Sequence, residues 1–220
     1  TENTSFANVN RIDNYNFGVV GPPGEGLYHK IAEDGEILSK GRNVMKEYYK
    51  MPGETADTFT EDGWLRTGDL GEIDENNVLK VTGRQKDLII TAGGKNIAPS
   101  RIEGIMTASK YINQICIVGD QKKYLSAVVT LDSDNIKAWA EDRGIAWETD
   151  ADLLEHPETK AMVDSEIAAR NRELPSFETI KKVTIVPEFT IENSMITPTF
   201  KLKKNVIMKN YQEEIETMYA

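Results

Sequence analysis

The chain has 220 residues, of which 39% are hydrophobic and 28% are charged. This composition is ordinary for a globular protein with an apolar core, and it argues against intrinsic disorder. Acidic residues outnumber basic residues, 36 to 26, and the formal net charge is −10. We therefore expect no general nucleic-acid binding, because neutralising phosphates requires clustered Lys and Arg side chains.

The chain has one cysteine, Cys116, which lies in an apolar run. A lone cysteine cannot form an internal disulfide, so we predict a buried core position and a reducing, cytoplasmic setting. We expect no membrane-spanning segment and no signal peptide, because no apolar run approaches about 18 residues. The chain starts at Thr1, within a polar stretch. We interpret it as part of a longer protein.

The first part of the chain, up to about residue 85, predicts short strands and tight turns. Residues 27–39 contain two apolar runs around Asp34-Gly35, and residues 70–81 contain two around the polar residues 74–77. Both patterns are typical of β-hairpins.

The remainder predicts alternating strands and helices, hence a small α/β domain. The acidic segment 141–158 has little periodicity, so we interpret it as a solvated connection or insertion. The expected strands are residues 88–91, 112–118, 125–131 and 180–186, and the expected helices follow Pro99, carry Ile136, begin at Pro157 and cover residues 207–218. The predicted fold class is α+β, with a β-rich part (1–85) followed by the α/β part (86–220).

Three clusters contain residues suited to chemistry. The first, residues 63–71, reads Gly-Trp-Leu-Arg-Thr-Gly-Asp-Leu-Gly. A carboxylate between glycines, here Asp69, can be presented at a site with little steric hindrance. Its two oxygens match two neighbouring sugar hydroxyls. Taken alone, the Gly-Asp pair is more typical of an ordinary turn.

The second cluster combines the charged residues 83–87 with an apolar run and a Gly-Gly pair. Arg84 could bind a ribose hydroxyl or a phosphate with its guanidinium. Gly93 and Gly94 would let the backbone approach a ligand closely. The simpler alternatives are a surface ion pair for Arg84 and a tight turn for the glycines.

The third cluster, residues 196–204, reads Ile-Thr-Pro-Thr-Phe-Lys-Leu-Lys-Lys. Lys201 lies in its Thr-rich part, outside any expected helix face. A lysine ammonium is a mobile point charge, suited to a carboxylate that attacks a phosphate. A basic surface segment is the alternative interpretation.

In this order, the three clusters resemble the adenylate-forming superfamily of acyl-CoA synthetases, aryl-CoA ligases, luciferases and peptide-synthetase adenylation domains. The resemblance covers nearly the whole chain, including Gly-Glu-Ile-Leu at residues 35–38 and Thr-Phe-Thr-Glu-Asp-Gly-Trp at residues 58–64. Residues 93–99 and 197–203 are most similar to long-chain fatty acyl-CoA synthetases. Thr1-Glu2 looks like the end of the family's Tyr-Gly-x-Thr-Glu motif.

The resemblance implies a two-step reaction with ATP, Mg²⁺, coenzyme A and a fatty acid. The carboxylate attacks the α-phosphate of ATP, which gives an acyl-adenylate and releases pyrophosphate. The thiol of coenzyme A then attacks the acyl carbon and releases AMP. Such chemistry depends mainly on positioning and charge stabilisation.

The resemblance also implies roles for single residues that bind the nucleotide. Asp69 would bind the ribose hydroxyls of ATP and AMP, and Arg84 would contact the same nucleotide. Glu2 would help to hold Mg²⁺ with ATP.

Other implied roles concern the switch between the two half-reactions. Lys86 would be the hinge about which a mobile C-terminal domain (86–220) rotates against the large N-terminal domain, of which residues 1–85 are the last part. Lys201 would act in the first half-reaction only, and Gly93 and Gly94 would line the pantetheine tunnel in the second. Closure would keep water from the adenylate.

Some family features lie outside this sequence. The Ser/Thr/Gly-rich phosphate loop and nearly all of the acyl pocket would precede residue 1, so the chain alone should not turn over substrate. Two alternatives stay open: another adenylate-forming ligase, acting on aryl acids or acylating a carrier protein, and a non-catalytic module that binds a nucleotide or a partner. Peripheral membrane contact is compatible with apolar substrates, although no basic amphipathic helix is evident.

Overall fold

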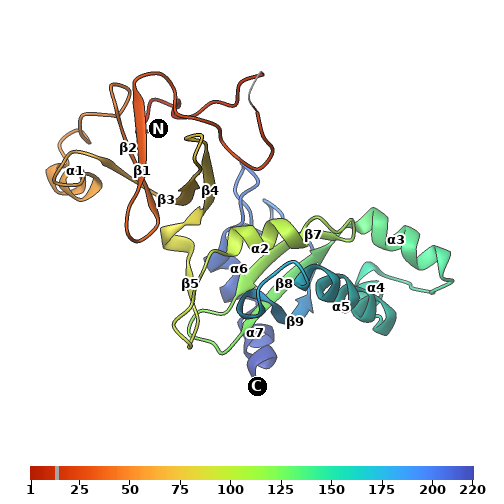
Figure 1. Ribbon diagram of the computed structural model, residues 1–220. Coiled ribbons are helices and arrows are strands. Elements are labelled where there is room, and N and C mark those ends of the chain that lie inside the picture. Colours follow the sequence, from red (N-terminus) through yellow and green to blue (C-terminus); the bar gives the residue numbers. More distant parts are fainter. Residues whose placement is uncertain (13–14) are drawn as a thin grey trace. The chain divides into compact units, whose positions relative to one another are not determined.

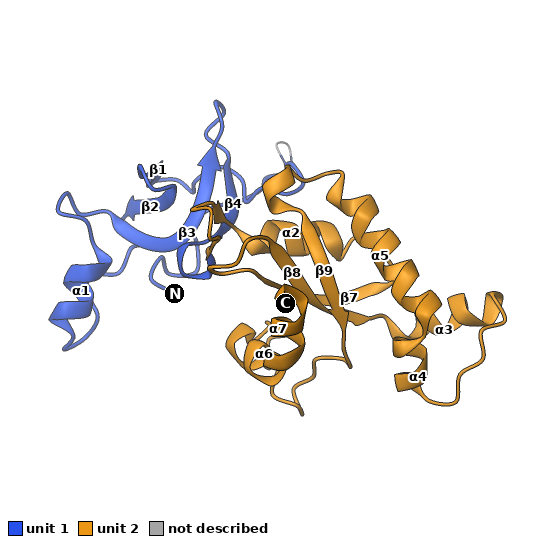
Figure 2. Ribbon diagram, turned by 90° about the horizontal axis from the view of Figure 1, so that it is seen from below, with its two compact units in different colours: residues 1–88 blue, residues 89–220 orange. Residues whose placement is uncertain are grey.

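The computed structural model describes residues 1–12 and 15–220, and these form two compact units. Unit 1 comprises Thr1–Leu88 and unit 2 comprises Ile89–Ala220 (Figures 1 and 2). No helix in the described residues is both long and apolar enough to cross a membrane.

Unit 1 is built on an antiparallel four-stranded sheet with strands in sequential order. Both predicted hairpins are confirmed. Gly35 adopts a φ of +86° in the first turn, and the Asp74 carboxylate accepts the backbone N–H of Val78 at 2.8 Å in the second. The elements are β1 Leu27–Ile31, β2 Glu36–Gly41, α1 Pro52–Thr58, β3 Leu65–Ile73, β4 Leu79–Arg84 and the 3-10 turn η1 Gln85–Asp87.

Two features of unit 1 differ from the expectation. Strand β3 begins at Leu65, earlier than predicted. Residues 66–69 are polar and lack an apolar alternation, so the sequence does not reveal this part of the strand, which lies between β2 and β4. The short helix α1 was not predicted. It buries no residue, so it leaves no apolar periodicity in the sequence.

Unit 2 contains a three-stranded sheet in the order β7-β8-β9, antiparallel between the first pair and parallel between the second. The parallel pair requires a long crossover connection, which α3, α4 and α5 supply. The elements are β5 Ile89–Ile90, β6 Asn96–Ile97, α2 Pro99–Met106, β7 Ile112–Val118, β8 Leu125–Leu131, α3 Ser133–Asp142, α4 Asp150–Glu155, α5 Pro157–Asn171, the 3-10 turn η2 Ser176–Glu178, β9 Ile180–Ile185, α6 Lys204–Asn210 and α7 Gln212–Tyr219.

Both faces of the unit 2 sheet are covered. Along β7, Ile115 and Ile117 belong to one apolar cluster, whereas Cys116 and Val118 belong to another. Helices α2, α3 and α5 contribute to the first cluster, and α6 and α7 contribute to the second. Because successive strand residues point to opposite faces, the central strand β8 is buried along its whole length. The predicted burial of Cys116 is confirmed.

Two expectations for unit 2 are wrong. Within segment 141–158, helix α4 is anchored by a capping box between Thr149 and Asp152, and Leu153 is 1% exposed. Leu153 and Leu154 are the only large apolar residues of this helix, and two adjacent residues are too few to produce a helical periodicity in the sequence. The expected C-terminal helix breaks at Tyr211, where φ is −111° and ψ is 30°, and so becomes α6 and α7.

Replacing Leu153 by alanine tests whether α4 belongs to the core. We expect the free energy of unfolding to fall by about 2–5 kcal/mol, because a buried leucine leaves a cavity. Leu154→Ala, at a partly buried position of the same helix, is the matched control and should lose less. Denaturant unfolding measures both variants. An equal loss of unfolding free energy in the two variants would contradict the burial of Leu153 in the core.

The Cys116 thiol is expected to be chemically inert while the protein is folded. The pKa of this thiol is raised to about 12, mainly by burial; the Lys204 ammonium lowers it and the Glu103 carboxylate raises it, each by less. Since the thiolate is the reactive form, reaction with a disulfide reagent at pH 8 should follow unfolding. Comparing rates in buffer and in denaturant measures this. Equal rates would show an accessible thiol.

Candidate nucleotide site

Unit 1 holds a cavity of about 760 Å³. Its lining includes four residues singled out from the sequence: Glu2, Asp69, Arg84 and Lys86. They come from the start of the chain, from β3, from β4 and from η1. Residues far apart in the sequence therefore meet at one concave surface, as expected for a ligand site.

Asp69 and Arg84 face each other across neighbouring strands. The register of β3 and β4 pairs these two residues directly, and Arg84 Nε lies 3.1 Å from Asp69 Oδ1. The Asp69 side chain is 35% exposed and the Arg84 side chain is 63% exposed. An ion pair this exposed contributes little to stability, so both groups are free to exchange their partner for a ligand.

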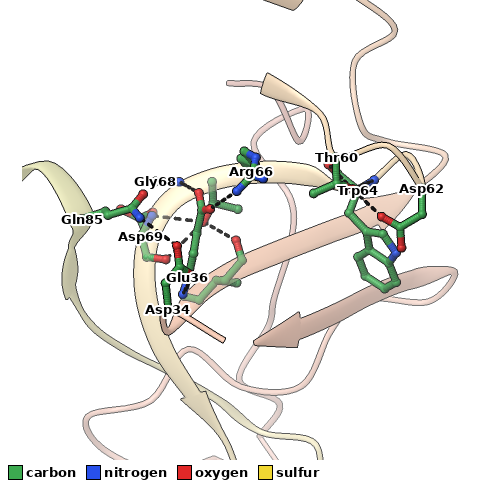
Figure 3. Close-up of polar contacts among 11 residues, drawn as sticks. Asp34, Glu36, Thr60, Asp62, Trp64, Arg66, Gly68, Asp69 and Gln85 are labelled. Atoms are coloured by element: carbon green, nitrogen blue, oxygen red, sulfur yellow. Dashed lines mark hydrogen bonds and ion pairs between the residues drawn. The ribbon is translucent and has the colours of Figure 1, made fainter. Parts of the chain in front are cut away.

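The backbone next to Asp69 is held by side chains (Figure 3). The buried Glu36 carboxylate accepts the Gly68 N–H at 2.9 Å and Arg66 Nη1 at 3.1 Å. The Thr67 hydroxyl accepts the Asp69 N–H at 3.1 Å and donates to a carbonyl of β2 at 2.7 Å. Glu36 also lines the cavity. Sequence reasoning treated it only as a strand residue, although a carboxylate at the head of an apolar strand was a usable signal.

Glu2 is fixed against a neighbouring segment. Tyr48 donates its hydroxyl hydrogen to Glu2 Oε1 at 3.0 Å, and the Met45 N–H donates to the Glu2 carbonyl at 2.7 Å. Its own backbone amide, and then the Tyr48 hydroxyl, lower the pKa of the Glu2 carboxyl. The same hydrogen bond raises the pKa of Tyr48. In the described residues, no group of three or more His, Cys, Asp or Glu side chains could hold a metal ion.

Lys86 is exposed within η1, close to the boundary between the two units. Its neighbour Gln85 donates its side-chain amide to Asp34 Oδ2 at 3.0 Å, which ties the end of β4 back to the first hairpin turn. Figure 3 shows this contact beside Asp69.

Gly93 and Gly94 form the turn that joins β5 to β6 in unit 2. Gly94 has a φ of +73°, which favours glycine, and its N–H donates to the Thr91 carbonyl at 2.8 Å. A Cβ atom at Gly93 would meet only Thr91 Oγ1, at 3.9 Å, and one at Gly94 would meet nothing within 4 Å. The unit itself therefore does not crowd this turn.

Lys201 lies on an exposed loop of unit 2, outside any helix as predicted. A bridge between Ile196 and Leu202 closes the loop, and the Thr197 hydroxyl accepts the Lys201 N–H at 3.0 Å. Within the described part of the chain, the Lys201 ammonium takes part in no ion pair. Further on, Lys204 is anchored by an ion pair of 2.8 Å to Glu103 of α2.

Comparison with known proteins identifies the family of the chain. The family described as AMP-binding enzyme C-terminal domain matches residues 86–220, more than half of the chain. The long-chain-fatty-acid–CoA ligase FadD15 of Mycobacterium bovis is 35% identical over 221 residues, covering 100% of this chain and 37% of that ligase. Long chain acyl-CoA synthetase 7 of Arabidopsis thaliana is 38% identical over 190 residues, covering 84% of this chain and 27% of that protein.

A solved structure also supports the α+β fold. The crystal structure of the ATP-bound RpMatB-BxBclM chimera B1 aligns with a TM-score of 0.70 and 28% identity, over 95% of this chain and 39% of that one. The chain thus spans well under half the length of the proteins that it matches. By its motifs, its family match and its fold, the chain belongs to the adenylate-forming, AMP-binding enzymes and corresponds to their C-terminal region.

Proposed function

We propose that this chain is the C-terminal part of an AMP-forming long-chain fatty acid–CoA ligase. Such an enzyme activates a fatty acid with ATP to an acyl-adenylate and transfers the acyl group to coenzyme A. The observation that carries the proposal is the Asp69–Arg84 pair, which faces a cavity large enough for a ligand.

The pair suits a nucleoside phosphate. Asp69 offers two acceptor oxygens to the two ribose hydroxyls, and Arg84 offers several N–H donors to ribose or phosphate oxygens. A related structure is described as ATP-bound, which supports the assignment of the nucleotide. Asp69 and Arg84 are therefore proposed as nucleotide-binding residues.

A magnesium ion would enter with the nucleotide. Mg²⁺ usually takes one or two carboxylates, together with water and substrate phosphates, so the single carboxylate of Glu2 is a sufficient protein contribution. Glu2 is the proposed magnesium contact.

Lys201 is the proposed catalytic residue of the first half-reaction. Its exposed ammonium lies on a loop closed by a hydrogen-bonded bridge, so it can reach a ligand while its backbone stays fixed. A positive charge near the attacking carboxylate and the α-phosphate would stabilise the charge of the transition state. Gly93 and Gly94, on their uncrowded turn, are proposed to line the path of the coenzyme A arm.

The mobile domain is proposed to be residues 86–220, with Lys86 as its hinge and residues 1–85 as the last part of a larger nucleotide- and acyl-binding domain. The family match begins at residue 86, and the compact units divide after Leu88. Rotation about this hinge would present the Lys201 loop and the glycine turn in successive half-reactions.

The proposed acid is a long-chain fatty acid, because the relatives are named as long-chain ligases and synthetases. The acyl pocket would come from the region of the relatives that precedes this chain. We also propose a cytoplasmic location, in keeping with the single buried cysteine.

The proposed function is tested in a protein that carries this chain together with that preceding region. Exchange of pyrophosphate into ATP should be fastest with long-chain fatty acids, slower with short-chain acids, and weak with aryl acids. A preference for an aryl acid would favour another adenylate-forming ligase, and no exchange with any acid would favour a non-catalytic module.

Lys201→Ala in the same protein separates the two half-reactions. We expect exchange to fall by about a hundredfold or more, since one preorganised charge is lost. Thioester formation from supplied acyl-adenylate should change little. Lys209→Ala, at an exposed lysine of α6, is the matched control and should keep both activities. Equal loss of both half-reactions in Lys201→Ala would contradict the assigned role.

Lys86→Pro tests the hinge. Proline fixes φ near −65°, so it should restrict rotation at this residue and slow thioester formation more than adenylate formation. Lys86→Ala removes the same side chain but leaves the backbone free, and it should retain both rates. Single-turnover measurements of each half-reaction distinguish the variants. If Lys86→Pro kept the wild-type rates of both half-reactions, residue 86 would not be the hinge.

A further inference from the structure

Glu36 is a buried carboxylate that the proposed function does not use. It is 2% exposed, and a buried charge persists only where it is paired and hydrogen-bonded. Both partners, the Gly68 N–H and the Arg66 guanidinium, belong to the segment that leads into Asp69. The side chain of β2 thus binds the part of β3 that presents the candidate ribose ligand.

The strand pairing is interrupted at this segment. Glu36 pairs with Leu70 and Leu38 pairs with Arg66, so one residue of β2 stands opposite three residues of β3. The ladder between β2 and β3 therefore does not fix residues 67–69, although Asp69 is paired with Arg84 on the side of β4, and a bulge of this kind redirects side chains.

Side-chain hydrogen bonds replace the missing ladder. Glu36 Oε1 accepts the Gly68 N–H at 2.9 Å, and Thr67 accepts the Asp69 N–H at 3.1 Å. Gly68 has a φ of +72°, a conformation that favours glycine and sets the direction of the next residue. The position of the Asp69 carboxylate consequently depends on the Glu36 carboxylate.

We infer that Glu36 is a positioning residue, which holds the bulge of β3 so that the Asp69 carboxylate meets the ribose hydroxyls of the nucleotide. This inference rests on the proposed role of Asp69. It adds that ribose recognition is set by a second, buried carboxylate, which acts on Asp69 through the Gly68 peptide.

The test compares ATP with 2′-deoxy-ATP in pyrophosphate exchange by the protein that carries this chain and its preceding region. The measured quantity is the ratio of kcat/KM for the two nucleotides. Asp69→Asn provides the reference for lost ribose recognition. Glu36→Ala removes both hydrogen bonds. Glu36→Gln keeps the size but leaves one acceptor oxygen for two donors; because the charged Arg66 guanidinium is the stronger donor, the glutamine N–H₂ is set against the Gly68 N–H. Glu72→Gln, an exposed carboxylate on the same strand, is the matched control.

We expect the wild type and Glu72→Gln to prefer ATP, and both Glu36 variants to lose this preference by about tenfold, toward the ratio of Asp69→Asn. A role in folding alone would lower exchange equally with both nucleotides and keep the ratio, which would overturn the inference. Where Glu36→Ala fails to fold, the ratio of Glu36→Gln decides.

The outcomes separate this inference from the proposed function. If Asp69→Asn loses the preference while the Glu36 variants keep it, the positioning role is overturned and the nucleotide site stands. If the wild type and Asp69→Asn have the same ratio, the ribose role of Asp69 fails, and the role of Glu36 fails with it.

Discussion

The pairing of β3 with β4 is the constraint on which the candidate site depends. It sets Asp69 opposite Arg84 and brings both to the cavity that Glu2 also lines. Because side chains alternate between the faces of a strand, a slip of one residue in either strand would turn that strand's group to the opposite face and separate the pair. The second hairpin turn, where Asp74 accepts the N–H of Val78, helps to hold the register of β3 and β4, and the buried Glu36 holds the segment that precedes Asp69.

In unit 2, one small sheet supports both loops that are proposed to act in the two half-reactions. The glycine turn leads into α2, which packs in the first apolar cluster. The Lys201 loop leads into α6, which packs in the second cluster, on the other face. With β8 buried on both sides, each loop is anchored to its own layer of a rigid centre. The proposed use of the two loops in successive half-reactions is compatible with this arrangement.

The sequence predicted most of this architecture because hydrophobic periodicity is strong where burial is strong. Strands β7 and β8 have the predicted bounds, and Asp69 and Arg84, both singled out from the sequence, line one cavity. The misses have physical causes. Helix α1 buries nothing, and α4 depends on one capping box and one leucine. The inferred positioning role of Glu36 depends on a bulge between two strands that are far apart in the sequence. The sequence could therefore mark this carboxylate as unusual but could not identify its partners.

The mixed pairing of the unit 2 sheet has a consequence for biosynthesis. The β7–β8 hairpin can form early from local contacts, but its parallel neighbour β9 follows only after three helices, and α6 and α7 follow later still. During translation, the face that carries Val118 and Val128 stays without its cover until these last helices leave the ribosome. The nascent chain therefore passes through a stage that exposes apolar surface, at which chaperones would bind it.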